Sequence, residues 1–130
     1  MINLQMKKEL IMGLVYIEVG IANPGRPKKM AKAKFLVDSG ALYSVVSEKV
    51  LSKLGIKAES KVTFNLANGE AIERKIGNAL FQYQGKRRAS PVIFGESGDS
   101  TLLGTITLEA LGFALDPLSR ELRPLPMILA

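Results

Sequence analysis

Three turn signals in series constrain the fold of this chain more than any other feature. They are Asn23 to Pro27, the pair Asn68–Gly69 and the pair Gly85–Lys86. Each lies between two stretches rich in β-branched, aromatic and other apolar residues, as the turn of a β-hairpin does. The flanking stretches are Leu10 to Ala22 with Lys32 to Val37, Val62 to Leu66 with Ala71 to Ile76, and Ala79 to Tyr83 with Ala89 to Phe94. Consecutive hairpins of this kind predict an all-β fold, a small closed barrel or a compact sheet.

The sequence also predicts two short helices. Ser47 can cap a helix from Glu48 to Leu54, because its hydroxyl can accept a hydrogen bond from a free backbone N–H of the first turn, and Gly55 is suited to end it. Thr105 stands in the same position before a second helix, from about Ile106 to Leu111. The expected class therefore stays all-β, with one or two short helices.

Both ends of the chain leave alternatives open. Asp116 to Ser119 predicts a turn, and Glu121 to Leu125 predicts a last strand. The apolar end, Met127 to Ala130, could join a sheet between two subunits or pack on its own subunit. Residues 1–8 could form an extra strand or a flexible lead.

Composition narrows the chemistry that the chain can perform. The 130 residues, 47% of them hydrophobic, suit one domain that spans residues 1–130 and buries its own core. The chain has no Cys and no His, which excludes thiol nucleophiles, Ser-His and Cys-His pairs, disulfides and the usual zinc ligands. An enzyme of this composition must transfer protons with carboxylates, Lys or Tyr. We therefore expect no metal and no cofactor.

Charge and hydropathy predict where the protein works. No apolar run reaches the length of a membrane span, and Lys7, Lys8 and Glu9 interrupt the N-terminal stretch before a signal peptide could form. We expect a cytoplasmic protein that does not associate with membranes. The net charge of +6 indicates either a solvated basic surface or contact with an acidic partner, and the low aromatic content favours the first over nucleic-acid binding. A nucleic-acid site would use Lys28, Lys29, Lys32, Lys86, Arg87 and Arg88, the first two in the loop of the first hairpin.

The stretch from Phe35 to Ala41 carries the candidate catalytic residue. Three apolar residues, Phe35 to Val37, would be buried in a sheet and would leave Asp38 at the edge of a region of low dielectric constant. Ser39 supplies a hydroxyl beside the carboxylate, and Gly40 lets the backbone turn. A strand that delivers a carboxylate into a tight loop can display a catalytic acid or base, although Asp-Ser-Gly is also a common turn sequence.

Further motifs follow Asp38-Ser39-Gly40-Ala41 in a characteristic order. The Asn68–Gly69 hairpin comes next, and Leu102-Leu103-Gly104 then predicts a buried strand that leads into a helix. Retroviral-type aspartic proteases have their active-site motif, their flap and a hydrophobic-hydrophobic-Gly motif in this order. From about Leu10 to Asp116 the chain therefore resembles the retropepsin-like, single-domain aspartic proteases and their cellular, prokaryotic-type relatives.

The resemblance implies an endopeptidase that works as a homodimer, because one chain holds one Asp-Ser-Gly motif. Gly98-Asp99-Ser100-Thr101 is no second copy, since no apolar strand precedes it and no glycine follows its serine. Two Asp38 side chains would meet on the two-fold axis and share one proton. The charged one would take a proton from a water that attacks the peptide carbonyl, and the protonated one would polarise the carbonyl oxygen.

The resemblance also implies roles for the other motif residues. Ser39 would hydrogen-bond across the dimer and hold the loops rigid, and Gly40 would admit the substrate backbone. Ala41 completes the motif and would support the active-site loop. The residues expected to close over an extended peptide as a flap are Ala67, Asn68 and Gly69. A plain surface turn explains the Asn-Gly pair equally well. The residues expected to pack beneath the Asp38 loop are Leu102, Leu103 and Gly104.

The chain departs from the retroviral pattern in two places. Leu42 and Tyr43 follow the motif where those enzymes carry acidic residues, and Thr105 stands where they have Arg. Both halves of an ion pair are thus missing together, which favours a cellular relative with different support for its dimer and cleft. Two rival functions stay open: a catalytically silent retropepsin-like module for dimerisation or peptide binding, and a basic β-barrel that binds nucleic acid.

Overall fold

The computed structural model describes residues 10–11 and 14–126, and most of this part of the chain is β-strand. The strands are β1 (Leu10–Ile11), β2 (Leu14–Asn23), β3 (Arg26–Val37), β4 (Ser44–Ser47), β5 (Ser60–Asn65), β6 (Ala71–Tyr83), β7 (Lys86–Gly95), β8 (Leu102–Leu103), β9 (Phe113–Leu115) and β10 (Leu122–Pro124). The helices are α1 (Glu48–Lys53) and α2 (Thr105–Ala110). The all-β class is confirmed. The alternatives for residues 1–8 and 127–130 lie outside the described residues.

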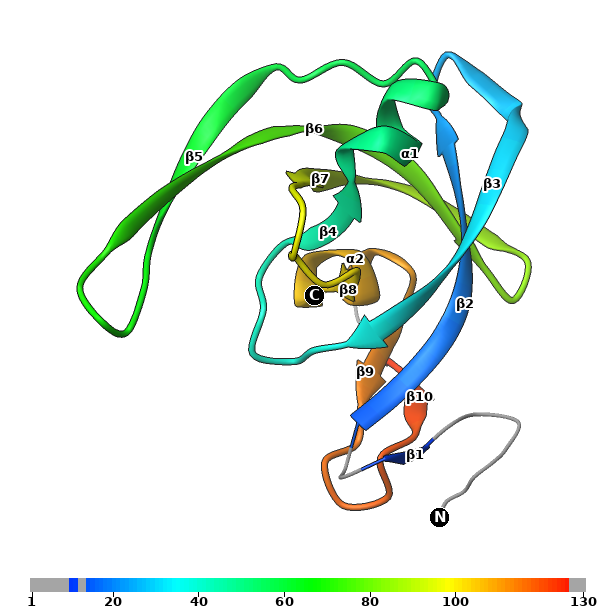
Figure 1. Cartoon of the computed structure of the whole chain (residues 1–130). Coiled ribbons are helices and arrows are strands. Elements are labelled where there is room, and N and C mark those ends of the chain that lie inside the picture. Colours follow the sequence, from blue (N-terminus) through cyan, green and yellow to red (C-terminus); the bar gives the residue numbers. More distant parts are fainter. Residues whose placement is uncertain (1–9, 12–13, 127–130) are drawn as a thin grey trace.

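A closed barrel forms the body of the molecule (Figure 1). The main sheet has eight strands in the order β1-β2-β3-β8-β4-β7-β6-β5, and an additional pairing between β2 and β6 closes it. Side chains that alternate along these strands fill the interior. Phe35 of β3 and Phe81 of β6 are fully buried there, with ring centroids 6.1 Å apart in an edge-to-face arrangement. Burial of the apolar run before Asp38, which the sequence predicts, thus fixes the strand that leads to it.

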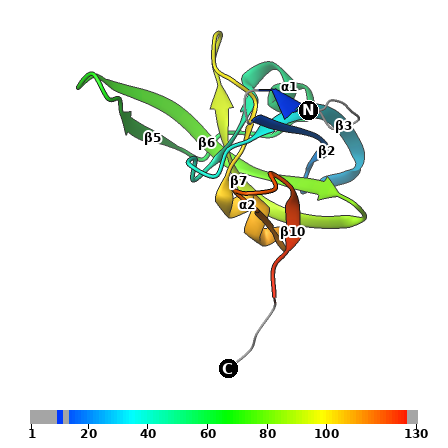
Figure 2. The same cartoon turned by 90° about the horizontal axis from the view of Figure 1, so that it is seen from below.

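The first half of β6 and all of β5 form a hairpin that extends away from the barrel (Figures 1 and 2). We call residues 60–76 the projecting hairpin. Within the described residues β5 is the last strand of the sheet, so only one of its edges is paired. Strand β6 continues without a break into the barrel, where it pairs with β7 and β2, although the sequence predicts separate strands at 71–76 and 79–83. The hairpin and the barrel therefore share one strand.

Two turns differ in geometry from the prediction. Between β6 and β7 the turn lies one residue early, at Gln84 and Gly85, which both have positive φ (51° and 78°), as a type I′ turn requires. At the tip of the projecting hairpin only Gly69 has positive φ (88°). Asn68 does not, because its side-chain Oδ1 accepts the backbone N–H of Glu70 at 2.9 Å and builds a longer loop.

Strand β8 lies between the two strands that flank the candidate catalytic residue. Strand β3 leads into the loop of residues 38–43, which we call the Asp38 loop, and β4 leads out of it. β8 runs parallel to β3, with Leu36 opposite Leu102, and antiparallel to β4, with Val45 also opposite Leu102. Helix α2 follows β8 directly, so the predicted strand-to-helix transition is confirmed.

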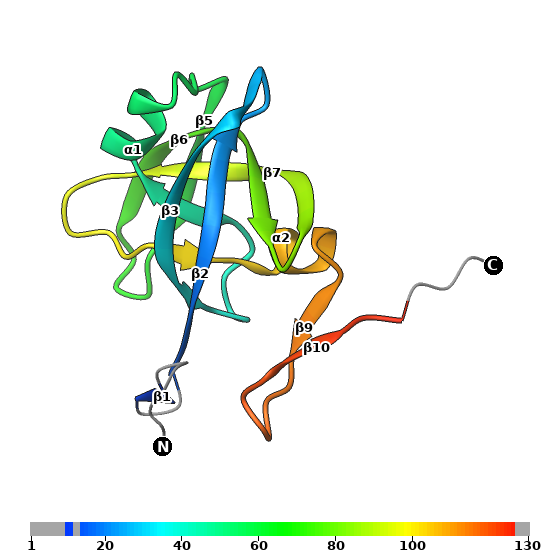
Figure 3. The same ribbon diagram turned by 90° about the vertical axis from the view of Figure 1, so that its right-hand side faces the viewer.

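A second, two-stranded sheet of β9 and β10 lies beside the barrel (Figure 3). Its connecting turn is held by Asp116, whose Oδ1 accepts the N–H of Leu118 at 2.9 Å. The other carboxylate oxygen accepts a hydrogen bond from Nε of Arg123 at 2.6 Å. The ring of Phe113 packs edge to face against Tyr83, with centroids 5.5 Å apart. The predicted turn and last strand are both confirmed.

Candidate functional site

Asp38 is the first residue after β3, at the position that the sequence predicts. Its backbone N–H donates to the carbonyl oxygen of Leu103 at 3.1 Å, so β8 holds the entrance of the loop. Its side chain is half-buried, whereas Ser39 and Gly40 are exposed. Carboxylate Oδ1 accepts the N–H of Gly40 at 2.9 Å, which makes an Asx turn. The loop therefore displays its carboxylate at the surface on a fixed backbone.

The exit of the Asp38 loop is bound to the start of helix α2. The backbone N–H groups of Thr105 and Ile106 donate to the carbonyl oxygens of Ala41 and Leu42, at 2.9 and 3.2 Å. The N-cap of α2 is Gly104, which has no side chain to accept these bonds. The prediction that Thr105 is the cap was wrong, because the loop carbonyls satisfy the free N–H groups of the first turn instead. The helix and the loop thus complete each other.

The three residues expected beneath the Asp38 loop all lie against it. Leu103 is fully buried, and Leu102 is half-buried. Gly104 approaches the loop so closely that a Cβ atom there would lie 2.6–2.7 Å from backbone atoms of Leu42 and Tyr43. Only glycine fits at such a distance.

A buried group of hydroxyls under the loop was missed by sequence reasoning. The hydroxyl of Thr107 in α2 lies 2.6 Å from that of Ser44 and 2.8 Å from that of Ser90. Ser44 also accepts the N–H of Gly104 at 3.0 Å. All three hydroxyl residues are at most 2% exposed. The sequence signal was a hydroxyl residue at positions where the pattern of β4, β7 and α2 calls for an apolar one.

A cleft of about 680 Å³ opens between the Asp38 loop and the projecting hairpin. Its lining starts at Gly40 and runs to Tyr43, and the residues of the loop before Gly40 are not part of it. Two exposed apolar side chains face it from opposite sides, Leu42 of the loop (56% exposed) and Leu66 of the hairpin (39% exposed). Within the described residues Asp38 takes part in no ion pair, and no three His, Cys, Asp or Glu gather as metal ligands.

The residues expected to form a flap lie at the exposed tip of the projecting hairpin. Ala67, Asn68 and Gly69 do not line the cleft of the single chain. The hairpin contributes Phe64, Leu66 and other residues nearer its base instead. The signal for these was present in the sequence, because apolar and polar residues alternate along both strands.

The basic residues lie elsewhere. Lys28 and Lys29, which we expected in a loop, belong to strand β3, because that strand begins already at Arg26. All the residues considered for nucleic-acid binding are exposed, and none lines the cleft: Lys28, Lys29, Lys32, Lys86, Arg87 and Arg88. No helix in the described part of the chain is long and apolar enough to cross a membrane.

Comparison with known proteins identifies proteins of similar sequence and fold. A family model described as aspartyl protease matches residues 24–108. No curated protein sequence matches the chain. Among solved structures the chain is similar to a retropepsin-like aspartic protease from Rickettsia conorii, with 24% sequence identity and a TM-score of 0.54. The similarity covers 79% of this chain and 76% of that one. The predicted retropepsin-like fold is thereby confirmed.

Proposed function

The chain belongs to the aspartyl protease family, as the match over residues 24–108 shows, and we propose that it is an endopeptidase that acts as a homodimer. One observation carries the proposal. Asp38 directly follows strand β3, in which Phe35 and Val37 are buried, and its loop is held on one side by β8 and on the other by α2, at the edge of a cleft. A catalytic acid needs a loop that is held rigidly in this way, because proton transfer demands a fixed geometry.

A dimer is proposed because one chain holds half of the required pair. The sequence has one Asp-Ser-Gly motif, and the lining of the cleft stops at Gly40, next to the exposed Ser39. A second copy placed against this exposed edge would bring its own Asp38 and extend the cleft across the two-fold axis. Ser39 of each chain would then hydrogen-bond to the other chain and align the two loops.

The proposed mechanism uses the two carboxyl groups in different protonation states. Two carboxylates at short range cannot both be ionised, so one holds a proton. The ionised Asp38 takes a proton from a bound water, whose oxygen attacks the scissile carbonyl carbon. The protonated Asp38 polarises the carbonyl oxygen through a hydrogen bond and, in the second step, gives its proton to the leaving nitrogen as the C–N bond breaks. The other Asp38 keeps the proton taken from water, so the pair again holds one proton.

The proposed substrate is an extended peptide. Leu42 and Leu66 would contact an apolar side chain from opposite walls of the cleft. Ala67, Asn68 and Gly69, at the tip of the projecting hairpin, would close over the peptide as a flap. The peptide backbone would pair with the protein as an added strand, which requires a substrate segment free of stable structure.

The experiment that tests the proposal compares the wild type with Asp38→Asn on a library of unstructured peptides from acid to neutral pH. Asparagine can still accept the Gly40 N–H, so the loop should keep its shape while the acid is lost. We expect cleavage to fall by at least ~10²–10⁴-fold. Activity that survives the substitution would reject the mechanism. The specific activity of the wild type should also rise with protein concentration near the dimer dissociation constant.

Two other outcomes would redirect the function. A dimer that binds peptides without cutting them would favour a silent binding module. Nucleic-acid binding that weakens steeply with salt would favour the exposed lysines and arginines of β3 and β7 as the functional surface.

A further inference from the structure

The cleft side of the projecting hairpin carries one cation among apolar residues. Side chains that alternate along β5 and β6 are half-buried on this side: Val62, Phe64, Ile72, Arg74 and Ile76. The residues between them are exposed. A charged side chain at a position that the pattern reserves for apolar residues needs a partner.

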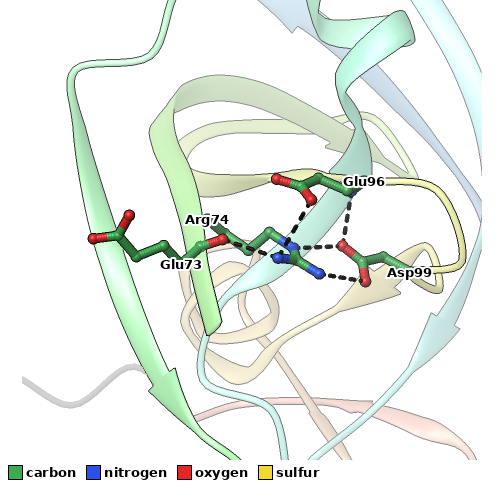
Figure 4. A network of polar contacts seen from close by, with 4 residues as sticks. All are labelled: Glu73, Arg74, Glu96 and Asp99. Carbon is green, nitrogen blue, oxygen red and sulfur yellow. Dashed lines mark hydrogen bonds and ion pairs between the residues drawn. The ribbon is translucent and has the colours of Figure 1, made fainter. Parts of the chain in front are cut away.

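The partner is Asp99, in the loop between β7 and β8 (Figure 4). Nε and Nη2 of Arg74 donate to the two carboxylate oxygens of Asp99 at 2.7 and 3.1 Å. Nη1 lies 3.5 Å from a carboxylate oxygen of Glu96. The side chains of Arg74 and Asp99 are 16% and 26% exposed. A two-point contact of this kind fixes both the distance and the orientation of the partners.

Two local hydrogen bonds give the loop that carries Asp99 its shape. Asp99 accepts the backbone N–H of Glu96 at 2.8 Å through its side chain, and its own N–H donates to the Glu96 carbonyl oxygen at 2.9 Å. The hydrogen bond from Arg74 holds the pKa of Asp99 below its ordinary value. The hydrogen bond therefore favours the ionised form of the Asp99 carboxyl group.

Both partners of this ion pair belong to the lining of the cleft, together with the Asp38 loop. Arg74 lies on the wall formed by the projecting hairpin, and Asp99 belongs to the loop between β7 and β8, which also contributes Gly98 and Ser100 to the lining. The separation of the hairpin from this loop affects the width of the cleft. An interaction that sets this separation in the free protein lowers the cost of ordering the site when a ligand binds.

We infer that Arg74 and Asp99 are positioning residues for peptide binding, and that their ion pair holds the projecting hairpin against residues 96–99 so that the cleft has its width before a peptide arrives. The inference rests on the proposed function for the nature of the ligand. Neither residue needs to contact the scissile bond. Loss of the pair should weaken peptide binding and leave the chemical step nearly unchanged.

The neighbouring residue offers a matched control. Lys75, on the opposite face of the same strand, pairs with Glu48 of α1 at 2.9 Å. Its side chain is 49% exposed and that of Glu48 is 43% exposed, and neither lines the cleft. An exposed ion pair of this kind contributes little to stability. Arg74 and Lys75 are thus neighbours in β6, but their ion pairs lie on opposite faces of the strand.

The test compares Asp99→Asn with Glu48→Gln. Asparagine keeps an oxygen for the Glu96 N–H, so the loop of residues 96–99 can keep its turn while the charge is removed. Hydrogen exchange of residues 60–76 in the free protein should become at least about threefold faster in Asp99→Asn. KM for a cleaved peptide should rise about tenfold with kcat within about twofold. Glu48→Gln should change neither quantity.

The outcomes separate this inference from the proposed function. Exchange in Asp99→Asn that matches Glu48→Gln would overturn the positioning role, whether or not the wild type cleaves peptides. A fall in kcat at constant KM would also overturn it, because the pair would then act on the chemical step. If no variant cleaves any peptide, the proposed function fails and the exchange measurement alone decides the role of the pair.

Discussion

The Asp38 loop and the loop at the tip of the projecting hairpin each contain a local hydrogen bond of the same type. In the first, Oδ1 of Asp38 accepts the N–H of Gly40 at 2.9 Å. In the second, Oδ1 of Asn68 accepts the N–H of Glu70, also at 2.9 Å. Both are Asx turns, in which a short polar side chain replaces a backbone acceptor. The two loops differ in the hydrogen bonds that they make with the rest of the molecule.

The difference lies in what holds each loop from outside. The Asp38 loop is bonded to β8 at its entrance and to α2 at its exit. The hydrogen bonds of the tip loop stay within the hairpin, for example from the N–H of Leu66 to the carbonyl oxygen of Glu70 at 2.7 Å. Residues 65–71 are all exposed. The local sequence thus determines the type of turn, whereas tertiary contacts determine how rigidly the turn is held.

The substitution Gly104→Ala should have the largest effect on stability, because it disturbs the contacts that hold the Asp38 loop. Its Cβ would lie 2.6–2.7 Å from backbone atoms of Leu42 and Tyr43, so the Asp38 loop must move away from α2. We expect a loss of about 2–3 kcal/mol in the free energy of unfolding, measured with urea. Gly25→Ala is a suitable control, because its Cβ would meet nothing closer than 3.4 Å. Equal losses in the two variants would contradict the close approach.

Thr107→Val tests the support one layer below the Asp38 loop. Valine has nearly the same shape, but it leaves the buried hydroxyls of Ser44 and Ser90 without their shared partner. The expected cost is about 1–3 kcal/mol in the free energy of unfolding. Thr63→Val on the exposed side of β5 should change this quantity by less than about 0.5 kcal/mol. If both threonines behave alike, the hydroxyl cluster has no structural role.

Gly69→Ala changes the loop at the tip of the projecting hairpin, which within the described residues has no hydrogen bonds to the barrel like those of the Asp38 loop. Gly69 has φ of 88°, and an added Cβ would meet no atom within 4 Å, so the cost is backbone strain alone. We expect about 1 kcal/mol of local destabilisation. Hydrogen exchange should rise near the tip while the amides around Asp38 keep their protection. A rise in both regions would show that the two loops are coupled.

The smallest expected effect on stability is that of a substitution in the Asx turn at Asp116, and this effect depends on pH. Hydrogen bonds from Arg123 and from the N–H groups of Leu118 and Ser119 lower the pKa of Asp116 from 3.8 to about 2. The ionised carboxylate therefore stabilises the fold above pH 3.8, and this contribution is lost as the pH falls through about 2. Asp116→Asn should lower the melting temperature at pH 6 and have its smallest effect near pH 2. A difference that does not depend on pH would contradict this assignment.

Local patterns carried most of the fold prediction. The turn residues located the hairpins, and the apolar run before Asp38 identified a strand that ends just before the carboxylate. Leu102-Leu103-Gly104 was predicted as a buried strand before a helix, which the structure has. These features depend on residues adjacent in the chain, and propensity and periodicity report on such neighbours. The homodimer, the single domain, the cytoplasmic location and the roles of the site residues stay predictions.

The features that escaped prediction join residues far apart in the chain. Arg74 meets Asp99, and Thr107 meets Ser44 and Ser90, through the tertiary arrangement of the elements and not through any local pattern. The sequence does show Arg74 and the three hydroxyl residues as polar side chains at positions where the pattern calls for an apolar one. It does not show which partners satisfy them, because pairing depends on strand order.

The position of β8 between β3 and β4 has a consequence for the order of folding. The amide of Leu36 bonds to the carbonyl oxygen of Thr101 at 3.0 Å, so the strand before the Asp38 loop lacks its inner neighbour until residues 101–103 have been synthesised and inserted. Contacts of such long sequence separation form slowly, because a long loop must close before they stabilise anything. In pulse-labelled refolding the Leu36 amide should gain protection later than the amides of the β6–β7 hairpin. A nascent chain that has not reached Leu103 would therefore hold Asp38 at the end of a strand that still lacks one of its two neighbours.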